Sequence, residues 1–144
     1  MIEASGGTLM YGTVVALDDW GVVLRCKSGS GRADLALQLI DRGAVLVADD
    51  QIQLVLSGGL VHASAPAAIA GLLEVRGVGV VPMPALARVP LALIVNLVPL
   101  EEVARLPDAK MENILGLELP VLDLFAFEAS APQKVKVALG SLLG

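Results

Sequence analysis

The stretch from Cys26 to Asp50, CKSGSGRADLALQLIDRGAVLVADD, decides the fold class of this chain. Glycine and serine fill its first part, a helix-like pattern follows, and an apolar run then ends in two aspartates. A glycine-rich loop before a helix can turn backbone N–H groups toward phosphate oxygens. Because an apolar segment over 22–25 precedes the loop, we predict an α/β unit of strand, loop, helix and strand.

The helix of this unit is predicted over 33–42, where Gly43 provides a stop signal. The next five residues, 44–48, form an apolar run typical of a strand covered on both faces, and the pair Asp49–Asp50 ends it. Non-helical connections downstream indicate a mixed rather than a fully parallel sheet, within a single domain over 1–144. The other predicted elements are strands over 8–17, 22–25, 51–56, 60–63, 72–75, 78–81, 91–98, 111–119 and 121–127, helical turns over 66–70 and 101–105, and a terminal helix over 132–143.

Composition excludes several classes of protein. Hydrophobic residues make up 56% of the 144 residues and charged residues 17%, which argues against a disordered or coiled-coil chain. The net charge of -5 provides no positive field for nucleic acid, and four aromatic residues are too few for a base-stacking platform.

The sequence also predicts a cytoplasmic protein that does not enter a membrane. The best apolar run, 89–100, is interrupted by Pro90, Asn96 and Pro99 and is too short to span a bilayer. No secretory signal is visible at the N-terminus, and the single cysteine, Cys26, cannot form an internal disulfide.

The loop departs from the usual phosphate-binding pattern G-x-x-x-x-G-K-[ST] at three of its four defined positions. Gly31 fits the second glycine, whereas Cys26 stands at the first. Arg32 replaces the lysine, and Ala33 replaces the residue whose hydroxyl ligates Mg²⁺. The pattern alone therefore leaves two interpretations open, a phosphate cradle and a glycine-rich turn that caps a helix.

Two segments together resemble the catalytic domain of the HPr kinase/phosphorylase family: Ser28 to Asp50, and Gly71 to Val80 with the sequence GLLEVRGVGV. The resemblance implies a P-loop core with a mixed sheet, similar to phosphoenolpyruvate carboxykinase, in a short form without the family's separate N-terminal domain. It also implies phosphorylation of a serine of the phosphocarrier HPr with ATP or pyrophosphate, reversal by inorganic phosphate, and assembly into hexamers.

The resemblance further implies roles for individual residues. Asp49 would be the general base for the seryl proton and the acid of the reverse reaction, and Asp50 would lie near the metal. Glu74 would help to hold Mg²⁺, and Arg76 would orient the active site within the segment Gly71 to Val80. The phosphate-binding residues would be Ser28, Gly29, Ser30, Gly31, Arg32 and Ala33.

The departures from the family's pattern fall at positions that would contact phosphate or Mg²⁺. Tyr11 stands where the family has a phosphate-contacting histidine, in addition to the changes at Cys26, Arg32 and Ala33. Without the resemblance, Asp49–Asp50 could simply end a strand in solvent, and Glu74 and Arg76 could form a surface ion pair.

These observations support three hypotheses. The favoured one is a degenerate member, a pseudoenzyme with a regulatory or scaffold role whose binding of ATP is weak and sensitive to Mg²⁺. The alternative is an active serine kinase/phosphorylase that acts on HPr, and the third is an unrelated small-molecule or structural domain. The expected partners are HPr or another signalling protein and further copies of the chain, with neither nucleic acid nor membrane.

Overall fold

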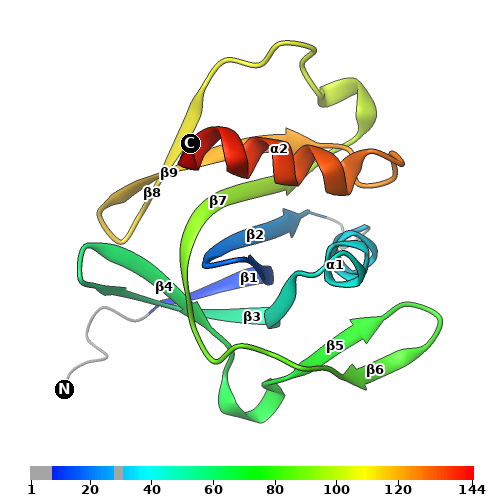
Figure 1. Cartoon of the computed structure of the whole chain (residues 1–144), viewed down its shortest axis with the longest axis vertical. Helices are drawn as coiled ribbons and strands as arrows, with labels where there is room; N and C mark the ends of the chain where they lie inside the picture. Colours follow the sequence, from blue (N-terminus) through cyan, green and yellow to red (C-terminus); the bar gives the residue numbers. More distant parts are fainter. Residues whose placement is uncertain (1–7, 28–30) are drawn as a thin grey trace.

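The computed structural model describes residues 8–27 and 31–144 as a mixed α/β fold (Figure 1). Within these residues, no helix is long and apolar enough to cross a membrane. The elements are β1 (Thr8–Leu17), β2 (Trp20–Cys26), α1 (Arg32–Asp41), β3 (Val45–Ser57), β4 (Leu60–Ser64), the 3₁₀ turn η1 (Ala67–Ile69), β5 (Leu72–Val75), β6 (Gly79–Pro82), β7 (Val89–Leu97), the 3₁₀ turn η2 (Leu100–Glu102), β8 (Lys110–Ile114), β9 (Leu117–Leu124) and α2 (Ala131–Leu143).

The predicted order of strand, loop, helix and strand is present as β2, the loop, α1 and β3. Helix α1 begins one residue earlier than predicted and buries Leu35, Ala36 and Leu39. Its chain then turns at Gly43, whose φ of 106° is a conformation that residues with a Cβ rarely adopt. The local signals of glycine and apolar spacing were therefore sufficient to place this helix.

Within the described residues, seven strands form one sheet in the order β2-β1-β3-β4-β7-β9-β8, and β2 also pairs with β7. This extra pairing closes β2, β1, β3, β4 and β7 into a ring, from which β9 and β8 extend. The pairs β2–β7 and β7–β9 are parallel, and the other pairs in this sheet are antiparallel. The mixed sheet predicted from the sequence is therefore confirmed.

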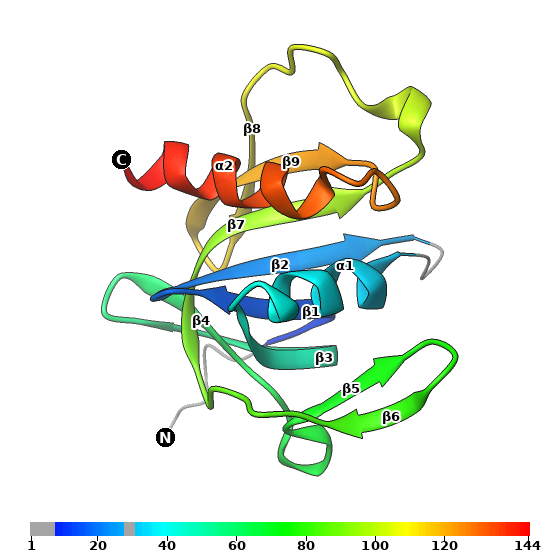
Figure 2. The same ribbon diagram turned by 45° about the vertical axis from the view of Figure 1, so that its right-hand side comes forward.

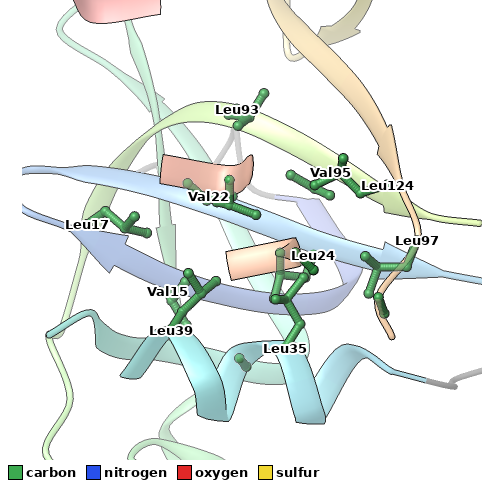
Figure 3. Close-up of a cluster of buried hydrophobic side chains, with 14 of the residues drawn as sticks. Val15, Leu17, Val22, Leu24, Leu35, Leu39, Leu93, Val95, Leu97 and Leu124 are labelled. Atoms are coloured by element: carbon green, nitrogen blue, oxygen red, sulfur yellow. The ribbon is translucent and has the colours of Figure 1, made fainter. Parts of the chain in front are cut away.

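Two layers of apolar side chains hold the fold together. One layer fills the ring, with Val14, Val23, Ile52 and Ile94 among its buried members. The other lies between the sheet and the two helices. Figure 3 shows this second layer, in which Leu35 and Leu39 of α1 approach the side chains of β1 and β2. Its labelled members are Val15, Leu17, Val22, Leu24, Leu35, Leu39, Leu93, Val95, Leu97 and Leu124.

The prediction that Asp49–Asp50 ends a strand was wrong. Strand β3 continues through both aspartates to Ser57, because β1 pairs with it along this whole stretch and places Thr13 opposite Asp49 and Gly12 opposite Asp50. Asp50 has a φ of 75°, a conformation that residues other than glycine adopt rarely. The acid pair consequently lies inside a strand of the sheet, where its geometry is set by the strands around it.

The predicted break at Pro120 was also wrong, since β9 runs through this proline. The hairpin between β8 and β9 turns instead at Leu115 and Gly116, which have φ values of 52° and 95°. Pro120 pairs with β8, whereas the ladder between β9 and β7 begins only at Val121. A proline is tolerated there because the ladder to β7 does not reach this position of β9, so no bond of that ladder needs the missing N–H.

Strands β5 and β6 form a separate antiparallel hairpin outside the large sheet (Figure 2). Leu73 is its buried anchor and packs in the same layer as α1. The turn of the hairpin contains Arg76 and Gly77, as the sequence predicted. The hairpin therefore brings the segment Gly71 to Val80 against the side of the molecule that carries α1.

Candidate functional site

The end of the glycine-rich loop is shaped by packing. Gly31 precedes α1, is buried, and has a φ of 91°. A Cβ at this position would lie 2.5 Å from the Cβ of Ala126 in the segment that follows β9. Glycine is therefore required here by both backbone conformation and close approach. The predicted phosphate-binding residues Ser28, Gly29 and Ser30 lie outside the described residues.

Asp49 is held by a donor on each of its oxygens. The hydroxyl of Thr13 in β1 donates to Oδ1 at 2.7 Å, and the backbone N–H of Glu74 in β5 donates to Oδ2 at 3.0 Å. Only 6% of the Asp49 side chain is exposed. Three strands thus fix a nearly buried carboxylate in one orientation.

Arg32, the first residue of α1, places its guanidinium beside the acid pair. Its Nη2 lies 3.8 Å from Oδ1 of Asp49 and 3.9 Å from Oδ1 of Asp50. The ring of Tyr11 stacks against it, with 4.7 Å between Cζ and the ring centroid, in a cation–π arrangement. Tyr11 stands where the family resemblance implies a histidine, and Arg32 stands where it implies a lysine. The two altered residues therefore contact each other.

The guanidinium of Arg32 is largely buried but incompletely satisfied. Only 11% of the side chain is exposed. Its Nε and Nη1 are buried and have no hydrogen-bond partner among residues 8–27 and 31–144. Buried donors without partners are uncommon in folded proteins and point to a ligand or an ordered group that completes them.

The remaining residues of the predicted metal site are more open. Asp50 is 54% exposed, and Glu74 and Arg76 are exposed and, although both are described, form no ion pair within 4.0 Å. Glu74 reaches Asp49 through its backbone N–H. Within the described part of the chain, no three His, Cys, Asp or Glu side chains gather to hold a metal.

These residues do not fit the Mg²⁺ that the resemblance implies. Mg²⁺ requires oxygen ligands in near-octahedral geometry. Ala33 lacks the expected hydroxyl, and the Arg32 guanidinium already lies close to both aspartates. The cation beside the acid pair is therefore the guanidinium of Arg32. The metal-binding roles of Asp50 and Glu74 remain predictions.

A cleft of about 640 Å³ opens beside this site, where β2 and β7 end. Tyr11 belongs both to the cleft wall and to the Arg32 site. Cys26 is half-buried in this wall, at the position of the first glycine of the phosphate-binding pattern. The complete lining consists of Tyr11, Arg25, Cys26, Lys27, Asn96, Leu97, Val98, Pro99 and Glu102.

Arg25 joins three strands at the edge of the cleft, and sequence analysis did not single it out. Its Nη1 and Nη2 donate to the two carboxylate oxygens of Glu112 in β8 at 2.9 and 2.7 Å. Its Nε donates to Oδ1 of Asn96 in β7 at 3.0 Å. The hydrogen bond from Arg25 lowers the pKa of Glu112. Glu112 is 87 residues away in the chain, so no local pattern could reveal this bridge.

The fold and the site together define a class of protein. A loop that ends in glycine joins β2 to α1, and the first turn of α1 faces a pair of aspartates in β3. Such an arrangement brings a helix N-terminus, a cation and carboxylates to one place, which suits the handling of phosphate groups.

Comparison with known proteins identifies the family within this class. The family of the HPr Serine kinase C-terminal domain matches residues 3–128, and the chain belongs to it. An HPr kinase/phosphorylase from Clostridium novyi is 39% identical over 79 residues, which cover 55% of this chain and 26% of that protein. One from Exiguobacterium sp. is 36% identical over 104 residues, which cover 67% and 33% respectively. The alignments thus span a quarter to a third of these relatives.

A solved structure supports the fold independently. The structure of the Hpr(Ser) kinase/phosphatase from Coxiella burnetii superposes with a TM-score of 0.82 and 24% sequence identity. The superposition covers 93% of this chain and 89% of that one. The family resemblance and the fold predicted from the sequence are both confirmed.

Proposed function

We propose that this chain is a degenerate member of its family, which binds a phosphate-bearing ligand such as ATP and has weak or no phosphotransfer activity. Its role would be that of a regulatory or scaffold module in a phosphotransfer or signalling pathway. The observation that carries the proposal is the position of Arg32, which lies 3.8 Å from the candidate base Asp49. A guanidinium engaged with the base cannot act as the compact ammonium that a phosphate-binding loop normally supplies.

The other altered positions support the same proposal. Tyr11 presents an aromatic ring in the place of the family's imidazole and uses it to contact Arg32. Ala33 provides no hydroxyl. Loss of one group that stabilises a transition state commonly lowers a rate about 10²–10³-fold, although several such losses are not simply additive.

An active serine kinase/phosphorylase is the second candidate function, and one observation favours it. Asp49 keeps donors from Thr13 and Glu74 on its two oxygens, so a general base would remain oriented beside the loop. Under this proposal Asp50 and Glu74 would lie near the transferred phosphate, and Arg76 would act from the hairpin turn.

Partners and assembly follow from membership of the family and are part of the proposal. The protein partner would be the phosphocarrier HPr or another signalling protein, and the chain would assemble with further copies of itself in the cytoplasm. A pull-down with HPr and a sedimentation measurement of molecular mass test these two statements. Failure to retain HPr, or a monomer at micromolar concentration, would remove the corresponding statement.

Phosphate incorporation separates the two candidate functions. The wild-type chain is mixed with HPr, Mg²⁺ and γ-³²P-labelled ATP, and the expected result is no label above a sample without the chain. The triple substitution Tyr11→His, Arg32→Lys and Ala33→Ser should restore measurable transfer, because it returns the imidazole, ammonium and hydroxyl. Adding Asp49→Asn to this triple variant is the matched control and should abolish the restored signal. Robust labelling by the wild-type chain would overturn the degenerate function and establish the active one.

A further inference from the structure

The acid pair already has a cation of its own. A single nitrogen, Nη2 of Arg32, lies 3.8 and 3.9 Å from Oδ1 of Asp49 and Oδ1 of Asp50. An ion shared by two carboxylates would have to stand between the same two oxygens. A guanidinium and a divalent cation therefore compete for one place.

The surroundings hold the guanidinium in that place. The Tyr11 ring covers it at 4.7 Å, and Gly31 anchors the start of α1 against Ala126. A cation in the first turn of a helix is unfavourable, because the helix dipole is positive at that end. The two aspartates offset this cost, because the guanidinium lies where both carboxylates attract a cation.

The same guanidinium has donors to spare. Its Nε and Nη1 are buried and without a partner among the described residues. Oxygens of a phosphate group are the acceptors that guanidinium donors prefer. One face of Arg32 thus neutralises carboxylates, and its remaining donors can complete an anion site.

We infer that Arg32 replaces the divalent cation at Asp49–Asp50, so that this site excludes Mg²⁺ and takes a phosphate-bearing anion independently of metal. The anion half of this inference rests on the proposed function, and the cation half does not. It also revises the expectation from sequence that ligand binding would be sensitive to metal. That expectation arose because several carboxylates near the loop would repel a phosphate group unless a cation lay between them. In the structure, the guanidinium of Arg32 lies beside Asp49 and Asp50 and supplies that cation.

Manganese binding tests the cation half. Free Mn²⁺ is followed by electron paramagnetic resonance while the wild-type chain, Arg32→Met and the double variant Arg32→Met/Asp49→Asn are titrated. Wild type should bind no Mn²⁺ below millimolar concentration, and Arg32→Met should bind at least about tenfold more tightly. The double variant should lose this gain.

The matched control is Arg88→Met, which removes an exposed arginine between β6 and β7 and should behave as wild type. Circular dichroism confirms the fold of each variant, and Arg32→Gln serves if Arg32→Met does not fold. Tight Mn²⁺ binding by wild type that Asp49→Asn abolishes would overturn the inference, as would a folded Arg32 variant without any gain.

Pyrophosphate binding tests the anion half. Titration calorimetry in EDTA and in Mg²⁺ should give dissociation constants within about twofold for wild type, whereas Arg32→Met should bind only with Mg²⁺. Wild-type binding that is strengthened about tenfold or more by Mg²⁺ would contradict the inference. No binding in either buffer would remove the anion half, and the proposed nucleotide binding with it, while the manganese titration still decides the cation half.

Discussion

Two arginines near opposite ends of one loop are held in different ways. Arg25, at the end of β2, uses Nε, Nη1 and Nη2 in hydrogen bonds of 2.7–3.0 Å. Arg32, at the start of α1, approaches its two aspartates only to 3.8 and 3.9 Å and leaves Nε and Nη1 without a described partner. Arg25 is nevertheless the more exposed, at 22% against 11%.

The difference separates a structural role from a functional one. A guanidinium whose three nitrogens all donate to protein groups stabilises the strands that it joins, and it has fewer donors left for a ligand. A guanidinium that is buried with unused donors is costly to the fold unless something else completes it. The contrast supports the proposal that the bridge from β2 to β8 serves stability and that the Arg32 site serves binding. Four measurements test this assignment.

Thr13→Val should produce the largest loss of unfolding free energy. It tests how strongly the Asp49 carboxylate of the Arg32 site depends on its Thr13 donor. The substitution keeps the shape of the side chain and removes the hydroxyl that donates to Asp49 at 2.7 Å. A buried carboxylate that loses a donor costs about 2 kcal/mol of unfolding free energy, measured by urea denaturation. Thr8→Val, at an exposed position of the same strand, is the control. Equal effects of the two substitutions would show that Asp49 does not depend on Thr13.

Arg25→Met should cost about 1–2 kcal/mol, because it removes a bidentate ion pair and a bond to Asn96 in a partly exposed place. A double-mutant cycle with Glu112→Gln, followed by urea denaturation, isolates the coupling between the two side chains. Additive losses in this cycle would mean that the bridge does not join β2 to β8 energetically.

Arg32→Met should change the unfolding free energy by less than about 1 kcal/mol, because it removes two unsatisfied donors together with the ion pairs. Asp49 keeps its hydrogen bonds from Thr13 and Glu74, so its carboxylate is not left without partners. The measurement is the same denaturation curve, compared directly with that of Arg25→Met. A loss larger than that of Arg25→Met would break the comparison and place Arg32 among the structural groups.

The pH dependence of the Arg25–Glu112 pair should be the smallest effect, about 0.5 kcal/mol, because Glu112 is 38% exposed and screened by water. The hydrogen bond from Arg25 lowers the pKa of Glu112 in the folded state below its ordinary value of 4.5. Its stabilisation is therefore present above that value and is lost as the pH falls through the lowered pKa. The stability difference between wild type and Arg25→Met should narrow over this acidic range in thermal melts. A constant difference down to pH 3 would contradict the assignment.

Local patterns predicted much of the fold because their information is local. The bounds of β1 match those predicted over 8–17, and helix α1 is displaced by one residue from 33–42. The predicted hairpin around Ser57 to Gly59 is present as β3 and β4. The wrong predictions concern strand ends, which depend on pairing with strands distant in the sequence. Strand β3 continues through Asp49 and Asp50 beside β1, and β9 continues through Pro120 beside β8.

The candidate site divides in the same way. The sequence alone determined the family, the loop, the acid pair and the substitutions at Tyr11, Cys26, Arg32 and Ala33, because each is a matter of residue type and spacing. Only the tertiary structure decided that Thr13 and Glu74 hold Asp49, that Tyr11 covers Arg32, and that Arg25 is tied to Glu112. Hydrogen bonds and ion pairs act over a few ångströms in space, and which groups come that close depends on how the strands pair and pack.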